Sequence, residues 1–153
     1  MKRNEGMFAI KLYELEKQYG RMQSRLRLCQ EEEDHEKILQ QLQSMMDEFR
    51  ENELLQAENA KSSRSRAVTA LAGAQAAYYG AVREVMEQEL PAYLHSEAST
   101  FSEDRVEAAA LYAEYAIDCA VQSMRYALIA VLKALDLQMS LEEKKEGSRQ
   151  GER

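Results

Sequence analysis

Residues 61–77 read KSSRSRAVTALAGAQAA, a cluster of serine and arginine that runs into a tract of alanine and glycine. A heptad stripe that starts at Leu39 continues in steps of three and four residues to Ala81 and passes through this cluster without a shift. A loop has no reason to preserve helical phase, so the pattern predicts one continuous helix over about 35–90. A break at 61–66 is the alternative, and it would allow a compact four-helix bundle.

The N-terminal part predicts a first helix over about 7–32 with a coiled-coil seam. The seam consists of Phe8, Leu12, Leu15, Tyr19, Met22, Leu26 and Cys29. Its next positions fall in the acidic run EEEDHE at 31–36, which favours solvent and the first turn of a new helix. We therefore expect a turn there, with Asp34 as the helix N-cap. A continuous helix with a skip in its repeat is the alternative.

The C-terminal part predicts a third helix, over about 101–143. Pro91 should kink and end the middle helix, because proline lacks a backbone donor and clashes with the preceding turn. Thr100 and Glu103 form a capping-box pattern that starts the third helix, with Ser102 as the competing cap. Residues 7–143 then form a single helical domain between a flexible segment at 1–6 and a disordered charged tail at 144–153.

Composition favours an all-α protein, because the chain has one proline, few glycines and many residues with high helix propensity. A net charge of −7 argues against diffuse attraction to nucleic acid or to an anionic membrane surface. Cys29 and Cys119 lack the spacing of a disulfide framework. The N-terminus lacks a signal-peptide pattern, and charged residues interrupt the most apolar stretch, 116–137. We expect a cytoplasmic protein without membrane insertion.

Small residues on the predicted helices let two helix axes approach closely, so they are the candidate packing and oligomer interface. This set contains Ala67, Ala70, Ala74, Ala77, Ala81, Ala110, Ala113, Ile117, Ala120 and Met124. The middle helix would be longer than either neighbour, which leaves its apolar surface partly uncovered within one chain. The sequence therefore predicts an elongated antiparallel bundle that is completed by a second copy in a homodimer.

A second candidate site is basic and consists of Lys61, Arg64, Arg66 and Arg83. These residues could contact a phosphate or a nucleic-acid backbone. On a continuous helix the first three do not share a face, and no aromatic residue lies between them for base stacking. A solvated polar girdle or hinge is the competing interpretation.

Catalytic and metal-binding patterns are weak. Glu32 and His35 have the Glu-x-x-His spacing of di-iron bundles, but His95 is the other histidine and lacks an acid three residues before it. The tyrosines could line a ligand pocket, although filling space between alanines is the default interpretation; they are Tyr78, Tyr79, Tyr93, Tyr112, Tyr115 and Tyr126. The chain contains no phosphate-binding loop or nucleophile elbow.

We therefore predict no enzymatic activity and no cofactor. The predicted function is that of a helical scaffold, adaptor or protein-interaction module that acts through oligomerisation and an unidentified protein partner. A nucleic-acid-associated accessory protein that uses residues 61–66 is the first alternative. A bundle that binds a small ligand or a metal is the second.

Overall fold

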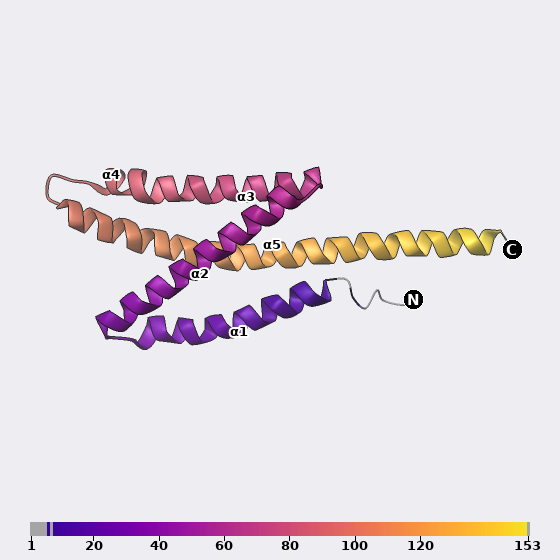
Figure 1. The fold of residues 1–153 in the computed structure, drawn as a ribbon, viewed down its shortest axis with the longest axis horizontal. Helices are drawn as coiled ribbons and strands as arrows, with labels where there is room; N and C mark the ends of the chain where they lie inside the picture. The colour runs from indigo at the N-terminus through magenta and orange to yellow at the C-terminus, as the bar shows by residue number, and fades with distance from the viewer. Residues whose placement is uncertain (1–5, 7, 153) are drawn as a thin grey trace. The chain divides into compact units, whose positions relative to one another are not determined.

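The computed structural model describes residue 6 and residues 8–152, and the chain is 90% helical. The elements are α1 (Ala9–Glu31), α2 (His35–Ser62), α3 (Arg66–Glu84), the π-helical turn η1 (Val85–Glu89), α4 (Leu90–Leu94) and α5 (Phe101–Gly151) (Figure 1). The described residues contain no strand. The predicted all-α class is confirmed.

The turn between α1 and α2 lies where the acidic run predicts it. Asp34 is the N-cap of α2, and its carboxylate accepts a hydrogen bond from the Glu36 backbone N–H at 3.0 Å. This bond satisfies one of the backbone donors that a helix start leaves unpaired. The turn at 31–36 is therefore confirmed, and the alternative of a skip in a continuous helix is wrong.

The two N-terminal helices are joined by an ion pair beyond this turn. Arg25 of α1 donates two hydrogen bonds to the Glu48 carboxylate of α2, at 2.8 and 2.5 Å. These bonds lower the pKa of Glu48 and raise the pKa of Arg25. The pair is solvent-accessible, so its main effect is to orient the two helices rather than to stabilise them strongly.

The continuous helix predicted over 35–90 is wrong, because the chain leaves helical geometry between Ser62 and Arg66. The Ser62 hydroxyl donates to backbone carbonyls of the last turn of α2, and the Ser65 backbone N–H donates to the Ser63 hydroxyl at 3.2 Å. Ser65 caps α3 by accepting a hydrogen bond from the Val68 backbone N–H at 3.4 Å. Serine side chains offer the backbone an alternative to helical hydrogen bonds, which explains the break.

Pro91 does not end its helix, which is a second difference from the prediction. The helix widens into η1 before Pro91 and continues as α4 to Leu94. The Leu90 N–H donates to the Val85 carbonyl five residues earlier, which is the π-helical pattern. Because proline can neither donate to the carbonyl four residues earlier nor pack closely against it, the wider turn accommodates Pro91 within a helix.

The last helix starts as predicted and ends later. Thr100 and Glu103 form both reciprocal hydrogen bonds of a capping box, which confirms the predicted start. The predicted end at 143 is wrong, because α5 continues through the charged segment to Gly151. Glutamate and lysine are good helix formers, and Gln138 donates to Glu142 at 2.9 Å across one turn. The disordered tail predicted from residue 144 is therefore helical to Gly151.

Contacts within the chain divide it into two units, Met1–Tyr78 and Tyr79–Arg153, with the boundary inside α3. In the first unit, α1 and α2 are joined by the turn and the ion pair described above. In the second, η1 and α4 pack against the start of α5. The flexible segment predicted at 1–6 lies outside the described residues except for Gly6.

Candidate functional site

The hairpin formed by α4, residues 95–100 and the start of α5 contains the two buried residues of the described chain (Figure 1). Asp104 is 1% exposed and Ala108 is 2% exposed. They are four residues apart and therefore share one face of α5. The small side chain of Ala108 lets a neighbouring helix pack closely there, and the carboxylate of Asp104 lies at the end of this contact.

The buried carboxylate is paired with the only histidine of the second unit. His95 Nδ1 lies 2.5 Å from Asp104 Oδ2 and links the end of α4 to the first turn of α5. The His95 side chain is 57% exposed, so its ring reaches the carboxylate from the solvent side. Asp104 Oδ1 is buried and has no hydrogen-bond partner among the described residues.

The electrostatics of Asp104 favour its ionised form. Hydrogen bonding from the Ser99 side chain, followed by the hydrogen bond and charge of His95, lowers the pKa of Asp104 against the opposing effect of burial. The Ser99 hydroxyl has one proton and also lies 3.1 Å from the Ser96 carbonyl, so the carbonyl and the carboxylate share one donor.

The serine, histidine and aspartate of the hairpin do not form a catalytic triad. A triad requires the serine at the imidazole nitrogen that the carboxylate does not occupy. The Ser99 hydroxyl instead interacts with the Asp104 carboxylate itself and with the Ser96 backbone, the latter at 3.0 and 3.1 Å. The arrangement can anchor a helix–loop–helix connection through a charged hydrogen bond.

Replacing Thr100 should weaken this connection measurably. Thr100→Ala removes the side chain that accepts from the Glu103 N–H at 3.2 Å, and we expect it to lower the free energy of unfolding by about 1 kcal/mol. Thr100→Ser keeps the acceptor and should change stability much less. Urea unfolding followed by circular dichroism measures both, and equal losses in the two variants would contradict a capping role.

The residues of the predicted helix-packing interface lie on two helices. Ala67, Ala70, Ala74, Ala77 and Ala81 lie on α3; Ala110, Ala113, Ile117, Ala120 and Met124 lie on α5. Met124 is half-buried, and the other nine are exposed in the single chain. Their role in packing against a partner stays a prediction.

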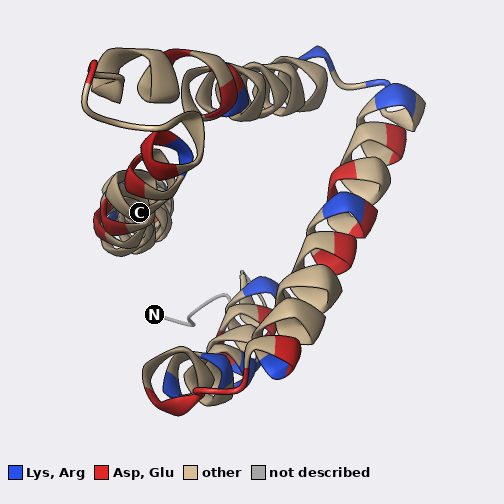
Figure 2. Ribbon diagram, turned by 90° about the vertical axis from the view of Figure 1, so that its left-hand side faces the viewer, with Lys and Arg blue, Asp and Glu red and all other residues tan. Residues whose placement is uncertain are grey.

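The predicted basic residues lie around the break between α2 and α3 and at the end of α3. Lys61 is in the last turn of α2, Arg64 is in the break and Arg66 is the first residue of α3; Figure 2 shows basic ribbon on both sides of the break. Arg83 lies in the last turn of α3, in the second unit. The first three lie within six residues of the chain around the break, and their contact with phosphate or nucleic acid stays a prediction.

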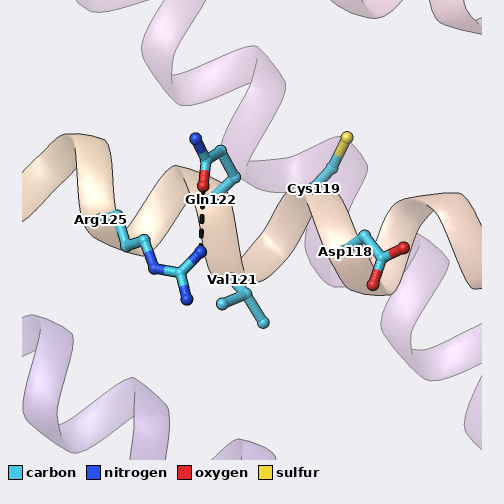
Figure 3. A pocket seen from close by; sticks show the side chains of 5 residues that line it. All are labelled: Asp118, Cys119, Val121, Gln122 and Arg125. Carbon is cyan, nitrogen blue, oxygen red and sulfur yellow. Dashed lines mark hydrogen bonds between the residues drawn. The ribbon is translucent and has the colours of Figure 1, made fainter.

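Side chains of α5 line a shallow hollow of about 500 Å³. Its lining consists of Asp118, Cys119, Val121, Gln122 and Arg125 (Figure 3). The Arg125 guanidinium donates to Gln122 Oε1 at 3.2 Å. All five residues lie on one helix, so they form an open surface rather than the enclosed site that a small ligand requires.

The remaining candidates are dispersed. Tyr93, Tyr115 and Tyr126 are exposed, and none of the predicted tyrosines lines the hollow on α5. Within the part of the chain that the structure describes, no three residues of the histidine, cysteine, aspartate and glutamate types are placed to hold a metal ion.

The pairing of His95 with Asp104 was missed in the sequence. A signal for it exists, because Asp104 lies four residues before Ala108 and eight before Tyr112, on the face of α5 that is covered by α4. A carboxylate on a covered face requires a partner, and His95 directly follows the helix that contacts this face.

One helix among the described residues, α5, contains an 18-residue stretch that is long and apolar enough to cross a membrane, with a mean hydropathy of 1.2. None of that stretch is buried within the chain. This criterion concerns length and composition only, and core helices of soluble proteins also meet it.

No protein-family model matches the chain, and no curated protein or solved structure is detectably similar to it.

Proposed function

We propose that the protein is a non-enzymatic helical scaffold or adaptor that works by self-association. The observation that carries this proposal is the near absence of burial, since only Asp104 and Ala108 are buried among the described residues. Contiguous apolar side chains that one chain leaves exposed are typical of surfaces that bind another protein.

The exposed residues form helical stripes rather than isolated positions. On α1 the predicted seam includes Leu12, Leu15, Tyr19, Met22 and Leu26, all exposed. On α5, Ile117 is 66% exposed and Leu128 is 46% exposed. Stripes with heptad spacing bury their apolar side chains when two helices pair. The partner that fits these stripes is therefore another amphipathic helix.

The sequence of α5 fits association with another protein better than insertion into a lipid bilayer. Asp118, Arg125, Lys133 and Asp136 interrupt its apolar region at intervals. Each of these charged groups would be costly in the hydrocarbon core, whereas all four can reach solvent at the edge of a helix–helix interface. We therefore propose a water-exposed assembly, with a second copy of this chain as the first partner.

Light scattering coupled to gel filtration tests the proposal. At micromolar concentration we expect a mass near twice the 17.6 kDa of one chain. A mass of one chain across the micromolar range would overturn self-association. Dimerisation that requires added phospholipid vesicles would favour the membrane interpretation of α5 instead.

A further inference from the structure

The second half of α5 has an apolar stripe that no element of its own unit is placed to cover. Ile117, Val121, Met124, Leu128 and Leu135 share one face at 3.6 residues per turn. The residues that pack toward α4, Asp104 and Ala108, project from the opposite face of the helix.

The two flanks of this stripe differ in chemistry. One flank has only alanine at positions 116, 120 and 127, which would let a second helix approach closely. The other flank has Asp118 and Arg125, seven residues apart and therefore at the same heptad position. Asp118 has no ion pair or hydrogen bond among the described residues, and Arg125 donates only to the neighbouring Gln122.

Charge is distributed unevenly along α5. Residues 101–122 include five acidic side chains and one basic side chain, whereas residues 123–141 include two basic side chains and one acidic side chain. A parallel pair of α5 helices would place the flank with Asp118 and Arg125 beside the alanine flank of the second copy, which leaves both charges without an oppositely charged partner. An antiparallel pair places opposite charges together.

From this arrangement we propose that α5 pairs antiparallel with α5 of a second copy about a twofold axis near Gln122, with Asp118 of each copy paired to Arg125 of the other. In this register Ile117 lies opposite Leu128 of the second copy, and Val121 lies opposite Met124. The centres of these apolar layers and of the ion pairs agree to within about one residue, or 1.5 Å of helix rise. The alanine flanks then face each other, as do the charged flanks.

This inference rests on the proposed self-association and assigns its interface. It also gives a role to the hollow on α5, whose lining includes Asp118, Val121 and Arg125. Ile117 (66% exposed) and Val121 (50% exposed) are accessible to a partner helix, and Met124 beside them is half-buried.

Charge exchange on the full-length chain tests the register. Asp118→Arg or Arg125→Asp alone places like charges together twice in each dimer, and we expect the dissociation constant to rise roughly tenfold or more at low ionic strength. The double exchange restores opposite charges, and its dissociation constant should return to within about threefold of the original. Sedimentation equilibrium measures each constant.

Lys133→Asp is the matched control, because it makes the same change of charge on the side of α5 away from the stripe. It should leave the dissociation constant within about twofold, since only screened long-range effects remain. If the original protein is dimeric and the single exchanges on the charged flank have no more effect than Lys133→Asp, the α5 interface is wrong while self-association stands. A monomeric original protein would overturn both proposals.

Thiol cross-linking tests the direction of pairing independently of charge. In a Cys29→Ser, Cys119→Ser background, Ile117→Cys and Leu128→Cys proteins are mixed and oxidised, because both positions lie several residues from the twofold axis and therefore far from their own copies in the antiparallel register. The antiparallel register predicts that the mixture yields a disulfide between the two variants, whereas either variant alone cross-links poorly. Efficient cross-linking of Ile117→Cys with itself would indicate parallel helices and overturn the register.

Discussion

Replacing Ala108 by leucine should lower the free energy of unfolding by roughly 1–3 kcal/mol, because the larger side chain must enter a contact that has no space for it. Ala108 is 2% exposed and lies where η1 and α4 pack against α5. Overpacking there forces either the leucine or the neighbouring helix out of its preferred position. Urea unfolding at neutral pH measures the loss directly.

Ala130→Leu is the control for this change, because it makes the same substitution at an exposed position of the same helix. Its effect should lie within about 0.5 kcal/mol, as for most surface substitutions. Equal stability of the Ala108→Leu protein and the original protein would mean that α4 does not pack closely on α5 in solution.

Replacing Asp104 by asparagine should remove a pH-dependent part of the hairpin's stability. The pKa of Asp104 is lowered in the folded chain, so below the unfolded value of about 3.9 the unfolded state binds the proton more readily. The stabilisation from the carboxylate is therefore complete only above about pH 5, begins to be lost as the pH approaches the unfolded pKa, and disappears as the pH falls through the folded pKa. The unfolding midpoint of the original protein should exceed that of Asp104→Asn at pH 5–6, and the difference should shrink at lower pH.

Thermal unfolding from pH 6 to pH 2.5 measures this difference. His95→Ala serves as a second variant, because it removes the Nδ1 contact at 2.5 Å but retains the carboxylate and its interaction with Ser99. It should keep part of the pH dependence that Asp104→Asn loses. A difference between the original protein and Asp104→Asn that stays constant over the whole range would show that the charge of Asp104 does not stabilise the hairpin.

Local hydrogen bonding explains which helix boundaries could be predicted. Asp34 and Thr100 cap α2 and α5 as expected, because an N-cap depends on a side chain and a backbone N–H only a few residues away. The break at Ser63–Ser65 also has a local cause, the capping tendency of serine, and it agrees with the alternative of a break at 61–66 rather than with the continuous helix that the heptad phase favours. Two separate helices, α2 and α3, can have apolar stripes in the same heptad phase without forming one continuous helix.

The π-helical turn before Pro91 shows where the local sequence permits more than one structure. Proline predicts a disturbance of the helix but not its form, because the chain can either end the helix or widen it. The Leu90 N–H finds the Val85 carbonyl, and contacts of α4 with α5 then favour continuation to Leu94. A contact between helices thus decided between two outcomes that the local sequence permits.

The sequence by itself determined the helical class, the turn at 31–36, the capping box and the apolar stripes, because these depend on propensity, periodicity and neighbours a few residues apart. Only the tertiary structure decided that Asp104 is buried against His95 and that Ala108 is the packed alanine among many similar ones. The physical reason is that burial depends on which face of α5 meets α4. That choice involves residues distant along the helix axis, and periodicity alone does not distinguish one alanine-rich face from another.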